Sequence, residues 1–451
     1  MSTNHGTEEK TTTAWRLLIN FLLYVSPVAL LTTVFPMVTP TINRYNLDGV
    51  PLIQVILAAS ITVPWLSQAA CLPLYRAIQM EHKKIADARE GLRIHAETLE
   101  HQLKRAEARA VRARMSEPQF QDITDLTAFT RNWLYLFFMT MPLVLLFAIP
   151  VALVLHWSPT AFGAFFVLGV LNIAFAQLLV IPNLAKNRII WFIAWLGYTL
   201  ALYCYPVIWF LPPLVGSLIL LVSLGKDLVH LLHFARIPLK DIALDALRGF
   251  FTGSIIWADK YMLFLVTGGE INVVAIYLSL IPGVIAYNYF FVVEADRVNA
   301  SIQHLWTIFD RLPYKGVQEE SSKALRTSNH AIRNSLLIYI ASAIVTGILM
   351  FIFLPQSYPL ALSGLVVAFL FVAVALLIYQ IEYMTMYVTV QLLSAAHLVL
   401  LFISFMILPN ETGYLPIIVG ETVLAFACYR VYRQAWAAPE YSLFWRRALA
   451  W

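Results

Sequence analysis

Four ionisable side chains lie in stretches that are otherwise strongly apolar. Asp259 and Lys260 are adjacent in one stretch, whereas His397 and Glu421 lie in two later ones. A charge in such a stretch costs free energy and usually faces a water-filled cavity or a partner group. Asp259 and Lys260 could therefore form a polar cavity wall that meets a charged or sugar ligand, and His397 and Glu421 could carry a proton.

Structural roles are open for the same four residues. Asp259 could pair with a charge on another helix, and the long side chain of Lys260 could extend toward the membrane surface. Neighbouring residues on a helix point about 100° apart, so we expect Asp259 and Lys260 not to face each other. His397 and Glu421 could each be a hydrogen-bonded packing residue.

Three further polar residues, Asp227, His230 and His233, are spaced three residues apart. On a helix they would lie on part of one face, which could hold a metal ion. No fourth ligand is evident, and the helix dipole also favours histidines near a helix C-terminus. The sequence contains no phosphate-binding glycine loop, nucleotide motif or nucleophile elbow. We therefore predict no catalytic residue, no metal site and no cofactor, and we expect the protein not to be an enzyme.

The elements that must position these residues are membrane-spanning helices. Hydrophobic residues make up 60% of the chain, and the mean hydropathy is +0.72. Crossing roughly 30 Å of hydrocarbon takes about 20 apolar residues in a helix, and unpaired backbone groups exclude open strands from lipid. The fold class is therefore all-α, a polytopic transmembrane bundle of about twelve helices. The predicted spans are Ala14–Val38, Val50–Tyr75, Asn132–Leu155, Ala161–Pro182, Ile189–Phe210, Leu214–Phe234, Leu247–Thr267, Asn272–Val293, Asn334–Leu354, Leu360–Tyr379, Tyr383–Leu408 and Gly413–Val431.

The basic residues predict the orientation. With both termini inside, Arg44 is the basic residue of the outer loops, Lys226 and Lys260 lie within spans, and the other 28 of the 31 Lys and Arg fall on the inner side. A bias of this kind indicates cytoplasmic termini. The net charge of +5 fits an anionic inner leaflet. The basic residues are spread over many loops, so we expect no nucleic-acid partner.

Two polar segments interrupt the spans on the inner side. The segment 76–130 contains a charged helix over Ile78–Ala110 with an apolar edge at Ile85, Leu92, Leu99 and Leu103. That edge could dock a partner helix, pack on the inner ends of the spans or form a short coiled coil; a solvated extension without a partner is the alternative. The segment 294–333 contains an amphipathic helix that lies either in the membrane interface or packed under the bundle.

The spans divide into two groups of six, an arrangement that recurs in transporters with the substrate path between the halves. We expect a cytoplasmic tail at 1–13, a first six-helix bundle at 14–234 with the insertion 76–130, and a second bundle at 247–431 with the helices of 294–333. A second cytoplasmic tail follows at 432–451.

Four short segments follow one another between Arg248 and Leu312. They are Gly249-Phe250-Phe251, Ile256-Trp257-Ala258-Asp259-Lys260, Tyr277-Leu278-Ser279-Leu280-Ile281-Pro282-Gly283 and Val293-Glu294-Ala295-Asp296. This order resembles the inner-membrane Pel polysaccharide transporter family, which has Trp-x-Asp-Lys in its seventh helix and Val-Glu-x-Asp after its eighth. That family belongs to the multidrug/oligosaccharidyl-lipid/polysaccharide flippase superfamily. The first span departs from it, with Tyr24-Val25-Ser26-Pro27-Val28 in place of a Ser-Ser-Gly-Pro-Trp-like segment.

The resemblance implies a bacterial inner-membrane flippase that moves a polysaccharide or a lipid-linked glycan through a central cleft by alternating access. Asp259 and Lys260 would line the cleft, Trp257 could stack on a sugar ring, and the helix Ile78–Ala110 would dock a glycosyltransferase, synthase or regulatory subunit. Two other classes remain open. A non-transporting scaffold would hold the charges paired and dry, and a membrane transferase would need clustered carboxylates or histidines at a membrane face.

The first prediction tests the topology. Single cysteines placed at Gln102 and Asn410 should react with membrane-impermeant reagents from opposite sides of the membrane, Gln102 from the cytoplasm and Asn410 from outside. The reason is the inward bias of the basic residues. Labelling of both positions in intact cells would contradict the orientation.

Overall fold

The computed structural model describes residues 5–101, 104–114, 124–185, 187–232, 237–270, 273–309 and 311–448. These parts are almost entirely helical. The described residues contain two strands of two residues each, β1 (Asn46–Leu47) and β2 (Val50–Pro51), which pair antiparallel. Asp48 and Gly49 both adopt positive φ, 47° and 88°, as a tight hairpin turn requires. This hairpin joins the first two spans.

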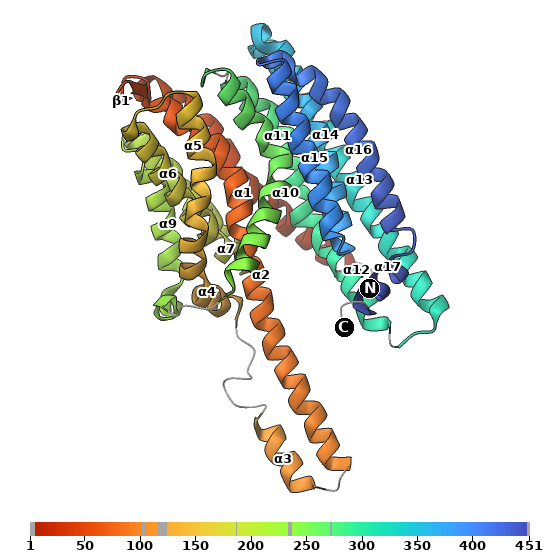
Figure 1. The fold of residues 1–451 in the computed structure, drawn as a ribbon. Helices are drawn as coiled ribbons and strands as arrows, with labels where there is room; N and C mark the ends of the chain where they lie inside the picture. Colours follow the sequence, from red (N-terminus) through yellow and green to blue (C-terminus); the bar gives the residue numbers. More distant parts are fainter. Residues whose placement is uncertain are drawn as a thin grey trace.

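The first half of the chain forms one group of helices (Figure 1). Its elements are α1 (His5–Ile42), α2 (Leu52–His101), α3 (Arg105–Arg114), α4 (Asp125–Thr140), the 3-10 turn η2 (Met141–Val144), α5 (Leu145–Val154), α6 (Pro159–Leu178), α7 (Val180–Leu184), α8 (Arg188–Cys204), α9 (Leu211–Ser223) and the 3-10 segment η3 (Gly225–Leu232).

The second half forms the other group, drawn in green to blue in Figure 1. Its elements are α10 (Leu239–Val266), α11 (Val273–Tyr289), the π-helical turn η4 (Phe290–Glu294), α12 (Ala295–Ile308), α13 (Tyr314–Phe353), the 3-10 turn η5 (Pro355–Ser357), α14 (Tyr358–Tyr383), α15 (Tyr387–Ile407), the 3-10 turn η6 (Glu411–Gly413), α16 (Tyr414–Ala435) and α17 (Pro439–Ala448).

The all-α prediction is confirmed, and the chain is a multi-pass membrane protein. In the described residues, nine helical segments are long and apolar enough to span a membrane, and a tenth span results if α9 and η3 are joined. Two further predicted spans are helical but differ from these. α8 has 17 residues, and α10 has 28 residues and carries Asp259 and Lys260.

The predicted straight span Leu214–Phe234 is wrong. α9 ends at Ser223, and η3 bends away from it by 104°. Gly225 provides the bend with a φ of +54°, a conformation that glycine adopts at low cost. The bend keeps Lys226 and Asp227 from continuing α9 through hydrocarbon, where charges are costly.

α2 and α10 join the two halves. They lie side by side at the centre of the molecule (Figure 1), while α1 packs against α11. Trp65 Nε1 of α2 donates a hydrogen bond of 2.7 Å to the carbonyl oxygen of Phe250. A Cβ atom on Gly249 would lie 2.8 Å from the Cα of Ala69, and one on Gly253 would lie 2.8 Å from the Cβ of Gln68. The two helices therefore approach closely because α10 has glycine where it crosses α2.

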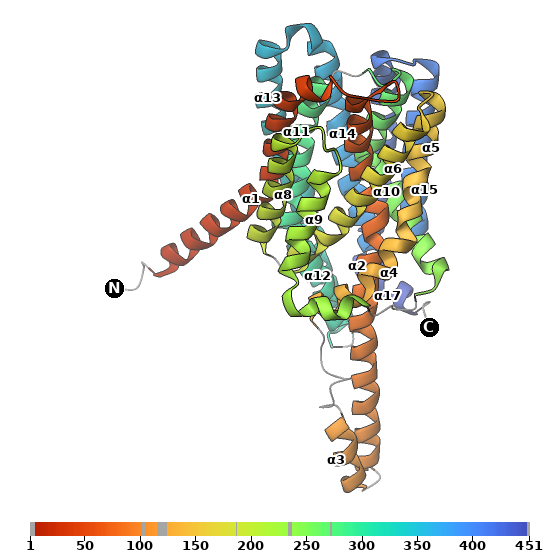
Figure 2. The same ribbon diagram turned by 90° about the vertical axis from the view of Figure 1, so that its left-hand side faces the viewer.

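Beyond the membrane, α2 continues to His101 and α3 packs back along its end (Figures 1 and 2). The single helix predicted over Ile78–Ala110 is therefore wrong, since the chain breaks before Arg105. Leu99 is buried, whereas Ile85 and Leu92 are half-buried. Leu103 lies outside the described residues. α2 and α3 thus form a helical hairpin, which we call the α2–α3 hairpin. Because α3 folds back on α2, the hairpin covers part of its own apolar edge.

The amphipathic helix predicted in 294–333 corresponds to α12. Its apolar residues Val298, Ile302 and Leu305 are buried, and it packs against α13. The sequence left two locations open for this helix, the membrane interface and the underside of the bundle. The structure shows α12 packed against the bundle.

The second prediction concerns the crossing of α2 and α10. Gly249→Ala should destabilise the protein by roughly 1–3 kcal/mol because the new methyl group overlaps the backbone of α2. Thermal unfolding of the detergent-solubilised protein measures the loss.

Gly91→Ala is the matched control. Gly91 lies in α2 with nothing within 4 Å of the added Cβ, so the same change should be neutral or stabilise the helix by up to about 1 kcal/mol. Equal melting temperatures for the two variants would contradict the close crossing.

Candidate functional site

Asp259 and Lys260 form an ion pair with each other. Lys260 Nζ lies 2.7 Å from Asp259 Oδ1 and donates a hydrogen bond of 2.9 Å to the carbonyl oxygen of Ile256, one turn earlier. Our expectation that the two side chains do not face each other is wrong. The lysine stem is long enough to curl back along α10, so the divergence of their Cα–Cβ bonds does not keep the charges apart.

The ion pair is attached to the last span. Tyr414, the first residue of α16, donates its hydroxyl to Asp259 Oδ2 at 3.1 Å. Asp259 is 1% exposed and Lys260 is 3% exposed. Both charges are thus withdrawn from solvent, and their partners are each other, the Tyr414 hydroxyl and a backbone carbonyl.

His397 and Glu421 form a second buried pair. His397 Nδ1 lies 2.7 Å from Glu421 Oε1, and both residues have no exposed surface. His397 Nε2 lies 3.3 Å from the carbonyl oxygen of Ser254 on α10. Because a carbonyl oxygen can only accept, Nε2 carries the hydrogen in that contact. The imidazole thus contacts α16 with one ring nitrogen and α10 with the other.

Phe371 of α14 lies between the two pairs. Lys260 Nζ is 5.4 Å from the centre of the Phe371 ring, and the ring meets His397 edge to face at 5.0 Å. A cation near an aromatic face is attracted by the ring quadrupole. We call the set formed by Asp259, Lys260, Tyr414, His397 and Glu421 around Phe371 the buried polar cluster. It draws on α10, α14, α15 and α16 of the second half.

The structure brings four of the sequence-predicted residues together and leaves Trp257 apart. Trp257 is half-buried and packs against the apolar core. Sequence reasoning missed Tyr414 and Phe371. A tyrosine at the start of a span is typical of a membrane-interface anchor, and a phenylalanine in an apolar helix has no distinguishing signal.

A charged network lies on the side of this cluster that faces the α2–α3 hairpin. Arg76 of α2 pairs with Asp245 of α10, and Arg248 reaches both Asp245 at 3.4 Å and Glu382 of α14 at 3.2 Å. Asp245 is buried. The network links the first half to the second at the end of the α2–α10 crossing nearer the α2–α3 hairpin. These charged residues are therefore paired with one another.

The other polar group of the sequence analysis does not converge on a site in the described residues. Asp227 and His230 lie in η3, and His233 lies outside the described residues. Among the residues that the structure describes, no group of three or more His, Cys, Asp or Glu side chains is arranged to hold a metal ion.

No family model and no curated protein matches the chain. Solved structures share part of its overall path, each covering 94% of this chain and 95% of the other. The crystal structure of MATE in complex with MaL6 has a TM-score of 0.48 at 11% identity. The outward-facing conformation of a multidrug resistance MATE family transporter of the MOP superfamily has 0.45 at 12%, and MATE in complex with Br-NRF has 0.43 at 13%. At these values the likeness assigns neither a family nor a function.

The third prediction tests whether the charges of Asp259 and Lys260 stabilise each other or are instead stabilised by water or another group. Asp259→Asn or Lys260→Met alone leaves one buried charge without its partner, which costs about 3–5 kcal/mol. Each single variant should therefore accumulate poorly in the membrane. The double variant should recover most of the wild-type amount, as measured by immunoblotting of membranes and thermal unfolding.

Lys226→Met removes an exposed lysine and serves as the control, with no expected loss. Single variants at wild-type abundance would show that water or another group solvates the remaining charge.

Proposed function

We propose that the protein is a transporter that exports a polysaccharide, or its lipid-linked precursor, across the bacterial inner membrane by alternating access. The buried polar cluster is the observation that carries this proposal. Ionisable groups within spans are costly and mark transport paths and proton relays. Apolar residues of similar volume would pack the same space at no greater cost, so stability alone does not explain the cluster.

The His397–Glu421 pair is the proton carrier in this proposal. Its short contact holds a proton that can leave only when the pair separates or meets water, because a neutral histidine lone pair would otherwise face a carboxylate. Glu421 Oε2 is buried and has no hydrogen-bond partner in the described residues. A buried polar atom without a partner costs free energy, which supports a functional role for the pair.

The substrate class rests on the resemblance of residues 248–312 to the Pel family. In the conformation described here Asp259 and Lys260 are closed off, so the proposal requires a second state in which the pair opens to the path between the halves. Trp257 would then offer an indole ring to a sugar. Substrate hydroxyl groups would replace the contacts that Asp259 now receives from Tyr414 and Lys260.

The hairpin of α2 and α3 would dock a glycosyltransferase, synthase or regulatory subunit. Ile85 and Leu92 keep part of their surface exposed after Leu99 is covered. Arg93 stabilises the helix beside them through contacts with Glu90 at 2.6 Å and Glu97 at 3.3 Å. A polymerase held at this hairpin would deliver its product at the inner face of the transporter.

The fourth prediction tests proton carriage. His397→Gln and Glu421→Gln should each abolish export. A glutamine side chain can form hydrogen bonds, but it cannot take up and release a proton near neutral pH. Protein abundance should fall much less than export, which is measured as extracellular polymer per unit of membrane protein. Ser404→Ala, also buried on α15, is the matched control and should export normally. Normal export by both glutamine variants would contradict the proposal.

A scaffold is the second candidate because the charges in the cluster are paired and buried in the described conformation. The two functions differ in which part of the chain is indispensable. Deletion of Ala86–Ala110 should abolish secretion under either function if the hairpin docks a partner. The cluster variants should abolish it only if the protein transports, so secretion by His397→Gln with failure of the deletion would identify a scaffold.

A further inference from the structure

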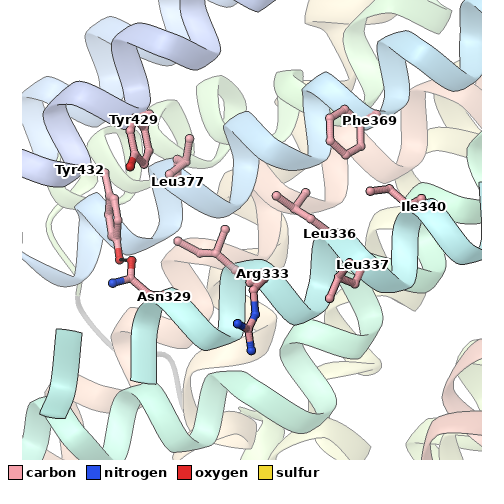
Figure 3. A pocket seen from close by; sticks show the side chains of 10 residues that line it. Asn329, Arg333, Leu336, Leu337, Ile340, Phe369, Leu377, Tyr429 and Tyr432 are labelled. Atoms are coloured by element: carbon pink, nitrogen blue, oxygen red, sulfur yellow. Dashed lines mark hydrogen bonds between the residues drawn. The ribbon is translucent and has the colours of Figure 1, made fainter. Parts of the chain in front are cut away.

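A groove opens on the side of the second half between α13 and α16, which both pack on α14 (Figure 3). Its volume is about 350 Å³. Leu336, Leu337 and Ile340 form one wall, and Phe369 of α14 contributes to the floor. Leu337 and Ile340 are 56% and 44% exposed. Side chains this apolar are stable at the surface only if hydrocarbon covers them, so the groove opens to the bilayer.

One end of the groove is polar. The Tyr432 hydroxyl lies 2.9 Å from Asn329 Oδ1 and 2.9 Å from Ser328 Oγ, which ties α16 to α13 there. The amide nitrogen of Asn329 is turned away from Tyr432, and Arg333 lies one turn further along α13 (Figure 3). The groove thus changes from polar to apolar along its length, as a lipid molecule does.

One arginine lines the polar end of the groove, and a second contacts a residue that lines it. Arg333 Nη2 contacts His330 Nδ1 at 3.0 Å, and Arg433 Nη1 donates to the hydroxyl of Tyr429, which lines the groove, at 3.4 Å. Neither partner is a carboxylate, so these contacts leave both positive charges unneutralised. Arg333 directly precedes the predicted span Asn334–Leu354 near the middle of α13, and Arg433 lies in the last turn of α16. The predicted topology places both at the inner leaflet, where anionic lipids attract basic residues.

We infer that this groove binds one anionic phospholipid of the inner leaflet. An acyl chain lies along Leu336, Leu337, Ile340 and Phe369, and the phosphate group lies at the polar end, where Arg333, Arg433 and the Asn329 amide can donate to it. A soluble anion is a poorer occupant, because the apolar length of the groove would stay unfilled. The inference is independent of the transported substrate.

The experiment measures bound lipid by native mass spectrometry of the full-length protein in detergent. Phosphatidylglycerol and phosphatidylcholine with identical acyl chains are titrated separately. The wild-type protein should bind phosphatidylglycerol at least fivefold more tightly. Arg333→Gln and Arg433→Gln should each weaken phosphatidylglycerol binding about fivefold and leave phosphatidylcholine binding unchanged.

Arg430→Gln is the matched control. Like Arg433, Arg430 lies on α16 and does not itself line the groove. Its guanidinium is over the ring of Phe426 at 5.9 Å, and Phe426 is not a lining residue, whereas Arg433 contacts the lining residue Tyr429. This variant should bind phosphatidylglycerol like the wild type. Equal loss in all three arginine variants would overturn the inference, because it would indicate general attraction to basic residues.

Two further arms test the acyl chain. Leu337→Trp fills the groove from an exposed position and should weaken binding of both lipids by a similar factor. Glycerol phosphate, which has the head group without acyl chains, should not compete with phosphatidylglycerol at equal concentration. Equal affinity of the wild-type protein for the two lipids, or effective competition by glycerol phosphate, would overturn the inference.

Discussion

The close crossing of α2 and α10 is the constraint on which the arrangement of the two halves depends. Gly249 and Gly253 bring α10 against the backbone and side chains of α2, and the Trp65 hydrogen bond fixes the register. In a membrane, helix association relies on such close packing because lipid is as apolar as the helices. The Arg76–Asp245 pair then holds the same two helices together on the side of the α2–α3 hairpin. The α2–α10 pair is thus the main contact between the halves, and α1 packed against α11 adds a second one.

The buried polar cluster depends on the same helix from its other side. Ser254 follows Gly253 directly, so α10 meets α2 with one face while the carbonyl oxygen of Ser254 faces His397 of α15. Further along α10, Asp259 accepts a hydrogen bond from the hydroxyl of Tyr414 on α16. A single helix therefore carries both the contact between the halves and the contacts with the ionisable residues. Because α10 is in contact with other helices on several sides, it exposes little surface to lipid. Its sequence can therefore contain glycines and charged residues among the apolar ones.

The sequence predicts helices and their faces well because long apolar runs have one stable form in lipid. It also identifies Asp259, Lys260, His397 and Glu421 as exceptional, because charges in such runs are costly. It does not predict their pairing, which depends on tertiary packing among α10, α15 and α16. The Lys260 side chain returning to Asp259 is a rotamer choice set by those neighbours. The break before Arg105 and the 104° bend after Ser223 are likewise missed, because apolar periodicity does not show where a chain turns back.

His397 connects the buried polar cluster to the helix crossing through its two ring nitrogens. Nδ1 lies 2.7 Å from Glu421 Oε1, so a separation of this pair would have to move the imidazole. The other ring nitrogen is bound to the Ser254 carbonyl oxygen, and a rotation of the imidazole would release it. That carbonyl belongs to the turn of α10 that includes Gly253, where the helix touches Gln68 of α2. A movement of His397 in the second half is therefore one hydrogen bond away from the helix crossing that joins it to the first.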